Sequence, residues 1–306
     1  QHMRMPDCQN ELIDEICKVQ ENVIVVLHNG SPVEMPWNDN VSAVLEVYLC
    51  GEATGEATAD ILFGKANPCG KLAETIPMKL SDTPCYLTFP GDRHAEYNEG
   101  VFVGYRYYDK KEMAVRYPFG HGLSYTTFEY SDIKLSDTAV GDDDILTVNA
   151  VITNTGNCVG KEIVQLYVAD KSGFAVRPEK ELKDFIKIEL QPGESKTVTF
   201  RLDKRAFSYY NEELGDWYAP NGKYDIMIAS SSRDIRLTAE VTHKTAVKLP
   251  FVATENTVFG EFMDYAEGKA TIDLLFSKVA KGLLGGDHFE PEAVRSMIGS
   301  MPLRQI

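Results

Sequence analysis

A short aromatic and acidic segment carries the clearest chemistry in the sequence. Residues 97–100 read Tyr97-Asn98-Glu99-Gly100. A tyrosine ring packs against the apolar face of a sugar ring, and a carboxylate accepts hydrogen bonds from sugar hydroxyls. Tyr97 and Glu99 could therefore contact a neutral, hydroxyl-bearing ligand. The alternative is structural, since the ten aromatic residues between positions 97 and 130 could instead pack between two domains.

Two turns that follow apolar runs form the second candidate site. Residues 28–32 follow the first run and contain Asn29 and Gly30, while residues 50–55 follow the second and contain Glu52. Ligands of open parallel α/β sheets bind beyond the carboxyl ends of the strands. The alternative is that both segments are only tight turns into helices. The glycines at 51 and 55 resemble a phosphate loop weakly, because the Gly-Lys-Ser/Thr ending is missing.

The elements that position these turns follow the order of a parallel α/β layer. Residues 9–20 have the apolar stripe of an amphipathic helix, and the continuous apolar runs 23–27 and 43–49 are typical of strands buried on both faces. Two such strands alone would leave an apolar sheet edge unpaired. Either another segment supplies the missing strands, or a partner chain covers this edge.

The pattern changes after residue 126. Four runs alternate apolar and polar residues and are separated by turn signals, which predicts an antiparallel sandwich. The runs are 146–152, 164–168, 198–202 and 224–228. Because no Cys…Trp…Cys pattern is present, a fibronectin type III-like domain is favoured over an immunoglobulin domain.

The last residues predict a helical tail. One apolar stripe comprises Ile272, Leu275, Phe276 and Val279, and a second comprises Val294, Met297, Ile298 and Met301. The predicted fold is α+β and multidomain, with a partial αβα sandwich layer, an antiparallel fibronectin type III-like β-sandwich and a short helical tail. The predicted segments are the α/β layer at 1–90, an aromatic-rich linker at 91–126, the sandwich at 127–245 and the tail at 246–306.

Composition excludes several functional classes. The formal net charge of −15 disfavours binding to nucleic acids and anionic membranes, and no apolar run approaches the length of a membrane span. The six cysteines are scattered, which favours reduced thiols, several of them buried, and a cytoplasmic setting. The six histidines are scattered too, so we expect no structural zinc and no cofactor.

Ordered motifs across the chain resemble the C-terminal half of a family 3 glycoside hydrolase of the β-glucosidase type. The matching segments are NGSPVEMPW at 29–37, GEATGEATADILFG at 51–64, NPCGKL at 67–72, YNEG at 97–100, VGYRYYD at 103–109, PFGHGLSYT at 118–126 and MPLR at 301–304. The resemblance implies retaining hydrolysis of terminal β-linked glucosyl residues by two carboxyl groups. It places the nucleophile on an N-terminal (β/α)-barrel and the acid/base directly before a stretch that residues 1–6 resemble.

The resemblance therefore implies that neither catalytic carboxylate lies in this chain. We expect the chain alone to be inactive and to need an N-terminal barrel half as partner, with a β-glucoside as substrate. Tyr97, Glu99 and Arg106 would lie near the substrate, followed by Asn29, Gly30 and Glu52. A stand-alone carbohydrate-binding or interaction module is the alternative, and homo-oligomer formation stays open.

Overall fold

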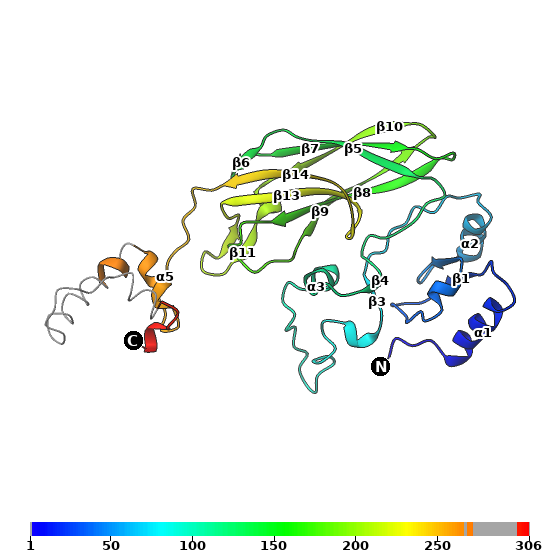
Figure 1. The fold of residues 1–306 in the computed structure, drawn as a ribbon, viewed down its shortest axis with the longest axis horizontal. Coiled ribbons are helices and arrows are strands. Elements are labelled where there is room, and N and C mark those ends of the chain that lie inside the picture. The colour runs from blue at the N-terminus through cyan, green and yellow to red at the C-terminus, as the bar shows by residue number, and fades with distance from the viewer. Residues whose placement is uncertain (1, 266–267, 272–298, 306) are drawn as a thin grey trace. The chain divides into compact units, whose positions relative to one another are not determined.

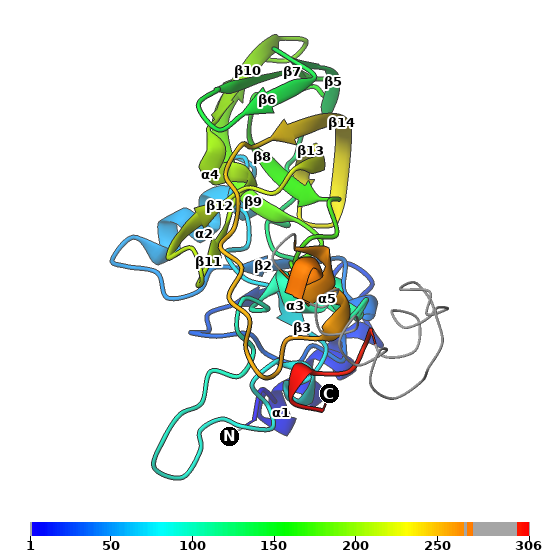
Figure 2. The same cartoon turned by 90° about the vertical axis from the view of Figure 1, so that its left-hand side faces the viewer.

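The computed structural model describes residues 2–265, 268–271 and 299–305, and the chain forms two compact units. The first unit consists of Gln1–Tyr209 and Tyr218–Thr245, and the second consists of Tyr210–Trp217 and Ala246–Ile306. The first unit contains an α/β layer and a β-sandwich, whose elements are labelled in Figures 1 and 2.

The α/β layer is built on a parallel pair of strands. Strand β1 (Ile24–Leu27) pairs with β2 (Ala43–Glu46), and the register runs from Ile24 opposite Ala43 to Leu27 opposite Glu46. The parallel pairing predicted from the two apolar runs is therefore confirmed. The helical elements of this layer are α1 (Asp7–Cys17), η1 (Asn38–Asn40) and α2 (Thr54–Leu62).

Three details of this layer differ from the prediction. Helix α1 begins two residues early, where the Asp7 carboxylate favours the first turn, and it ends at Cys17 because the Val19 and Gln20 amides turn back to the Ile16 carbonyl. Strand β2 ends at Glu46 and not at residue 49, because Tyr48 has a φ of 51° that no strand accommodates.

The third correction concerns burial of the apolar strand. Leu27 is buried, but Ile24 is 48% exposed, so β1 is not buried on both faces. Within the residues that the structure describes, β1 pairs only with β2. Leu12 and Val19, on and just after α1, are also largely exposed. An unpaired, partly apolar sheet edge is thus present in this part of the chain.

The core of the α/β layer forms around a buried tryptophan. Trp37 is 1% exposed and clusters with Leu27, Met35 and Ile76. Its indole nitrogen donates to Asn10 Oδ1 at 3.0 Å, which fixes the turn after β1 against α1. Strand β3 (Ile76–Pro77) pairs with β4 (Val115–Tyr117), and η2 (Leu80–Asp82) and α3 (Tyr105–Lys110) lie between them in the chain.

The sandwich consists of a three-stranded sheet, β10-β7-β5, and a five-stranded sheet, β6-β14-β13-β8-β9, which Figure 2 shows stacked on one another. Its strands are β5 (Phe128–Leu135), β6 (Ala139–Gly141), β7 (Leu146–Asn154), β8 (Gly160–Asp170), β9 (Glu181–Leu190), β10 (Ser195–Leu202), β13 (Gly222–Ser231) and β14 (Asp234–Lys244). The four predicted alternating runs are strands β7, β8, β10 and β13. In β7 the alternation buries Leu146, Val148, Ala150 and Ile152 completely.

The remaining elements are short. Helix α4 (Lys204–Phe207) precedes a hairpin of β11 (Tyr209–Asn211) and β12 (Asp216–Tyr218). In the second unit, α5 (Phe259–Asp264) packs Phe259 against Leu303, the first residue of η3 (Leu303–Gln305). The first predicted tail stripe lies outside the described residues, as does the second except for Met301.

The cysteine prediction was wrong in one respect. All six thiols are free, but Cys8 and Cys50 are exposed and the other four are partly exposed, so none is a buried core residue. The described parts of the chain contain no helix long and apolar enough to span a membrane. Nor do they contain a group of three or more His, Cys, Asp or Glu side chains that could hold a metal ion.

Candidate functional site

Polar side chains gather at the carboxyl ends of β1 and β2. Asn29 follows β1, Glu46 ends β2, and Tyr48 lies two residues beyond. Glu46 Oε1 accepts a hydrogen bond from the Tyr48 amide at 3.0 Å, and Asn29 Nδ2 donates to the Ser31 carbonyl at 2.8 Å. The other polar atoms of these side chains, Asn29 Oδ1, Glu46 Oε2 and the Tyr48 hydroxyl, are buried without a hydrogen-bond partner in the described structure.

The electrostatics of this strand-end cluster follow from its burial. Burial raises the pKa of the Glu46 carboxyl group, and burial together with the nearby Glu74 carboxylate raises the pKa of the Tyr48 hydroxyl. The Glu74 carboxylate lies close enough to the Tyr48 hydroxyl to raise its pKa. Buried polar atoms without partners are costly, so this cluster is suited to a ligand or further chain that supplies hydrogen bonds.

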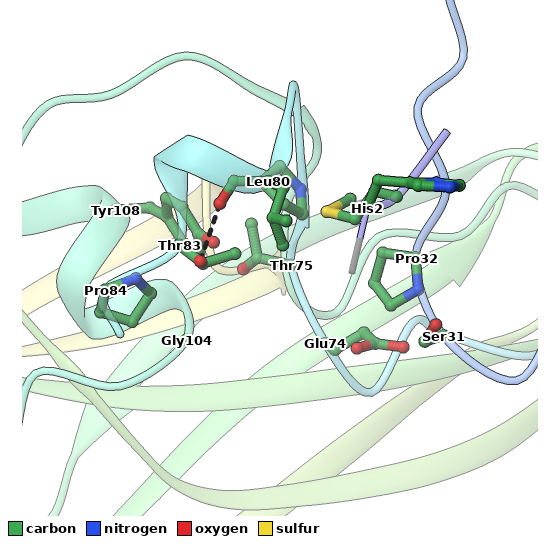
Figure 3. A pocket seen from close by; sticks show the side chains of 12 residues that line it. His2, Ser31, Pro32, Glu74, Thr75, Leu80, Thr83, Pro84, Gly104 and Tyr108 are labelled. Carbon is green, nitrogen blue, oxygen red and sulfur yellow. Dashed lines mark hydrogen bonds between the residues drawn. The ribbon is translucent and has the colours of Figure 1, made fainter. Parts of the chain in front are cut away.

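A groove of about 520 Å³ lies beside this cluster. Figure 3 shows His2, Ser31 and Pro32 on one side of it, and Thr83, Pro84 and Tyr108 on the other. The remaining lining residues are Met3, Glu74, Thr75, Pro77, Leu80 and Gly104. A concave site with apolar walls and a few polar groups is typical of small-molecule binding.

The aromatic-rich segment contacts the sandwich. Tyr105 stacks on Phe119 with ring centroids 4.9 Å apart and meets the edge of Tyr167, on β8, at 5.9 Å. Its hydroxyl accepts from the Leu182 amide at 2.8 Å. The interdomain role considered for these aromatics is therefore correct for Tyr105 and Phe119.

Two residues of the NPCGKL segment also hold this junction. Lys71 Nζ lies 3.0 Å from Glu162 Oε1 on β8 and donates to the Gly122 carbonyl at 2.8 Å. Asn67 accepts from the Tyr125 amide at 2.9 Å and donates to the Val159 carbonyl at 2.9 Å. Both side chains therefore hold the α/β layer and the sandwich together.

Residues 1–125 match the Glycosyl hydrolase family 3 C-terminal domain, and residues 162–232 match the Fibronectin type III-like domain. The chain is 50% identical over its whole length to Thermostable beta-glucosidase B of Acetivibrio thermocellus, covering 40% of that protein. The chain belongs to glycoside hydrolase family 3.

Other family 3 relatives also match this chain over only part of their own length. An Exo-alpha-(1->6)-L-arabinopyranosidase of Bifidobacterium breve is 44% identical over 84% of the chain and 34% of its own length. The crystal structure of a Bifidobacterium adolescentis GH3 beta-glucosidase superposes with a TM-score of 0.80 at 43% identity, over 89% of this chain and 40% of that one. The chain thus spans about a third to two fifths of the length of these relatives and corresponds to their C-terminal part.

The structure brings only some of the sequence candidates of this family 3 chain together. Asn29 belongs to the strand-end cluster, and Gly30 is exposed next to it, where an added Cβ would meet the Leu49 side chain at 3.5 Å. Glu52 is exposed just before α2. Tyr97 is 85% exposed, and Glu99 is partly exposed in the same loop.

Arg106 points to the sandwich junction. Its guanidinium lies 3.2 Å from Glu181 Oε1 on β9, which also pairs with Arg177 and Lys183. Burial opposes ionisation of Glu181, but these three cations together hold its pKa below the usual value. Arg106 is therefore occupied by an ion pair in this structure.

Sequence reasoning missed Glu46, Tyr48, Glu74 and Tyr108. Glu46 did carry a signal, because it is the one charged residue within the apolar run 43–49. A carboxylate in such a strand has to face either a partner or a site. The other three gave no local signal, since their positions depend on the backbone turn at Tyr48 and on α3 packing beside the turn after β1.

Proposed function

We propose that this chain is the C-terminal part of a retaining β-glucosidase that hydrolyses terminal β-linked glucosyl residues. The 50% identity over all 306 residues to a thermostable β-glucosidase carries this proposal. The proposed partner is an N-terminal (β/α)-barrel half, consistent with relatives about 2.5-fold longer than this chain. That half would supply the nucleophile, and the segment joining it to this chain would supply the acid/base.

Two structural features support an absent half. The β1 edge is unpaired and partly apolar, and the strand-end cluster has three buried polar atoms without partners. Both defects would be corrected by additional chain that pairs with the sheet and covers the carboxyl ends of its strands. The residue boundaries given above and the substrate-proximal roles of Tyr97, Glu99, Arg106, Asn29, Gly30 and Glu52 remain part of the proposal.

Double displacement needs both a nucleophile and an acid/base, so the isolated chain should be inactive. The test incubates the purified chain with an aryl β-glucoside, alone and after co-expression with the N-terminal segment of the Acetivibrio relative that this chain does not match. We expect no turnover by either piece alone and turnover by the reconstituted pair.

The alternative outcomes are separable. Turnover by the purified chain alone would contradict the assignment of both carboxyl groups to the missing half. Absence of turnover by a folded, co-purifying pair would contradict the proposed partnership with a barrel half. A catalytically dead barrel variant serves as the control for contaminating glycosidase.

A further inference from the structure

The junction between the α/β layer and the sandwich contains a thiol beside an ammonium group. Lys187 Nζ, from β9, lies 3.2 Å from Cys69 Sγ, in the segment that leads to β3. Cys69 is partly exposed and Lys187 is exposed, so small solutes can reach both groups. All six cysteines are free, and within the described residues Cys69 is the one whose sulfur accepts from a cation.

Sheet geometry explains why Lys187 contacts a sulfur and not a carboxylate. The residue opposite it on β8 is the apolar Ile163. The acidic residue two positions along the same face of β9 is Glu189, which lies opposite Lys161 and pairs with it at 3.2 Å. Lys187 forms no ion pair with a carboxylate of the residues that the structure describes, so the thiol is its polar partner there.

The thiol is held on both sides by residues that anchor its segment to the sandwich. Asn67, two residues before Cys69, donates to the Val159 carbonyl at 2.9 Å. Lys71, two residues after it, lies 3.0 Å from Glu162 Oε1. The backbone that carries the ammonium group is fixed as well, because β9 pairs with β8 along its length. Two groups held next to one another in this way react with the advantage of an intramolecular reaction.

A thiol beside an amine has a defined chemistry with hydrogen peroxide. The thiolate is the reactive form of cysteine, and a neighbouring cation stabilises a negative charge. The sulfur attacks one peroxide oxygen, the O–O bond breaks, and the leaving hydroxide takes a proton from the Lys187 ammonium group. The products are a sulfenic acid on Cys69, a neutral amine on Lys187 and one water. The sulfur loses two electrons in this step, and the peroxide gains them.

We propose that hydrogen peroxide links Cys69 to Lys187 through a covalent sulfur–nitrogen bond, which makes this pair a redox-dependent clamp between the α/β layer and the sandwich. In the second step the neutral amine attacks the sulfenic sulfur, the S–N bond forms and the S–O bond breaks. The hydroxide leaves with a proton of the amine as a second water. A sulfenic acid condenses with a backbone nitrogen to a sulfenamide in the same way, and an amine is the stronger nucleophile. Two thiols of a reductant restore the thiol and the amine and become one disulfide.

The clamp would act on stability because of its span. Cys69 and Lys187 are 118 positions apart in the chain, so the new bond closes a long loop. Closing a long loop restricts the unfolded chain more than the folded one. The oxidised chain should therefore unfold at a higher temperature than the reduced chain.

The test treats the purified 306-residue chain with stoichiometric hydrogen peroxide and maps its proteolytic peptides by mass spectrometry without reductant. We expect a peptide pair joined at Cys69 and Lys187, lighter than the two free peptides by about 2 Da, because the linked pair has lost two hydrogens. Dithiothreitol should release the two peptides. Thermal melts should show a higher melting temperature after oxidation, and dithiothreitol should reverse the rise.

Two variants separate the clamp from general cysteine oxidation. Lys187→Arg keeps a cation beside the sulfur, but its guanidinium stays protonated and does not attack. In this variant Cys69 should form a sulfenic acid that dimedone traps, with no cross-link and no rise in melting temperature. Cys50→Ser removes an exposed thiol that donates to the Val47 carbonyl at 2.9 Å, and the cross-link should persist.

Three results would overturn the proposal: a parent chain in which Cys69 stays a thiol or oxidises without a link to Lys187, a cross-link that forms equally in Lys187→Arg, or equal cross-linking of the other thiols to lysines. Peptide mapping reads the bond itself. The outcome therefore depends neither on glycosidase activity nor on the proposed function.

Discussion

Lys71 and Glu162 form a nearly dry ion pair across the junction of the α/β layer and the sandwich. Their side chains are 10% and 5% exposed, and their charged atoms are 3.0 Å apart. Glu162 also accepts from the Tyr130 hydroxyl at 3.0 Å. Replacing Lys71 by Met would keep the apolar stem but leave the Glu162 carboxylate buried with one neutral donor. Breaking a buried pair in this way costs about 3–5 kcal/mol.

The structure also predicts how a second substitution changes that cost. Glu162→Gln retains an acceptor for Tyr130 but removes the charge, so Lys71→Met/Glu162→Gln should be about 1–2 kcal/mol more stable than Lys71→Met alone. Lys65→Met is the matched control in the same segment. Lys65 pairs with Asp60 at 3.2 Å, but the two side chains are 76% and 45% exposed, so its loss should cost less than about 1 kcal/mol.

Urea unfolding followed by tryptophan fluorescence measures these differences. In a Trp217→Phe background the remaining tryptophan is Trp37, buried in the core of the α/β layer, so the signal reports on that layer. A Lys71→Met cost below about 1 kcal/mol, or strict additivity of the two substitutions, would refute the claim that a buried charge pair joins the layer to the sandwich.

Three further perturbations test other parts of the structure. Gly120→Ala should lower the free energy of unfolding by about 2–4 kcal/mol, because φ is 77° and the new Cβ would lie 2.3 Å from Gln165 Oε1. Gly64→Ala is the control, since Gly64 has a φ of 73° but open space around it, and it should cost about 1 kcal/mol in the same urea assay. Burial lowers the pKa of His243 below its unfolded value of 6.5, so the unfolded chain binds more protons and stability falls as the pH drops below about 6.5. His243→Gln should make the melting temperature depend less on pH between about pH 5 and 7. An unchanged pH dependence would contradict the assignment of this effect to His243. Arg177→Met should cost about 3–5 kcal/mol by calorimetry, because it leaves the buried Asp170 carboxylate without its bonded cation and removes one of the three cations that pair with Glu181. A loss under about 1 kcal/mol would contradict this prediction.

The sandwich could be predicted from sequence because each of its strands carries a local pattern. Alternation in β7 reports which side chains face the second sheet, and this holds whatever the partner strand is. A local pattern also identified β1 as a strand, because a continuous run of β-branched and other apolar residues is typical of a strand in a parallel sheet. It could not predict that Ile24 is half exposed, because exposure depends on the neighbouring strand and not on the run itself.

The site was less predictable for a related reason. Asn29 lies two residues beyond the end of β1, so the rule for parallel sheets predicts its position near the end of that strand. Tyr48, Glu74 and Tyr108 reach that region from three separate segments, through a backbone turn and a helix packed beside the turn. Arg106 shows the opposite case, since its motif suggests proximity to substrate while its guanidinium contacts Glu181 on the sandwich.

Whether a buried polar group has a hydrogen-bond partner distinguishes structural residues from candidate site residues better than membership of a family motif does. Lys71 stands in a family motif, yet its ammonium group is matched by Glu162 and a carbonyl, so its burial is explained within the chain. The buried atoms of Glu46 and Tyr48 are not matched, and each such atom costs about 1–3 kcal/mol. A stable fold can contain such unpartnered atoms where a ligand or another chain segment completes their hydrogen bonds. The unmatched atoms and the unpaired β1 edge occur in the same small sheet, so the proposed N-terminal partner could complete both of them.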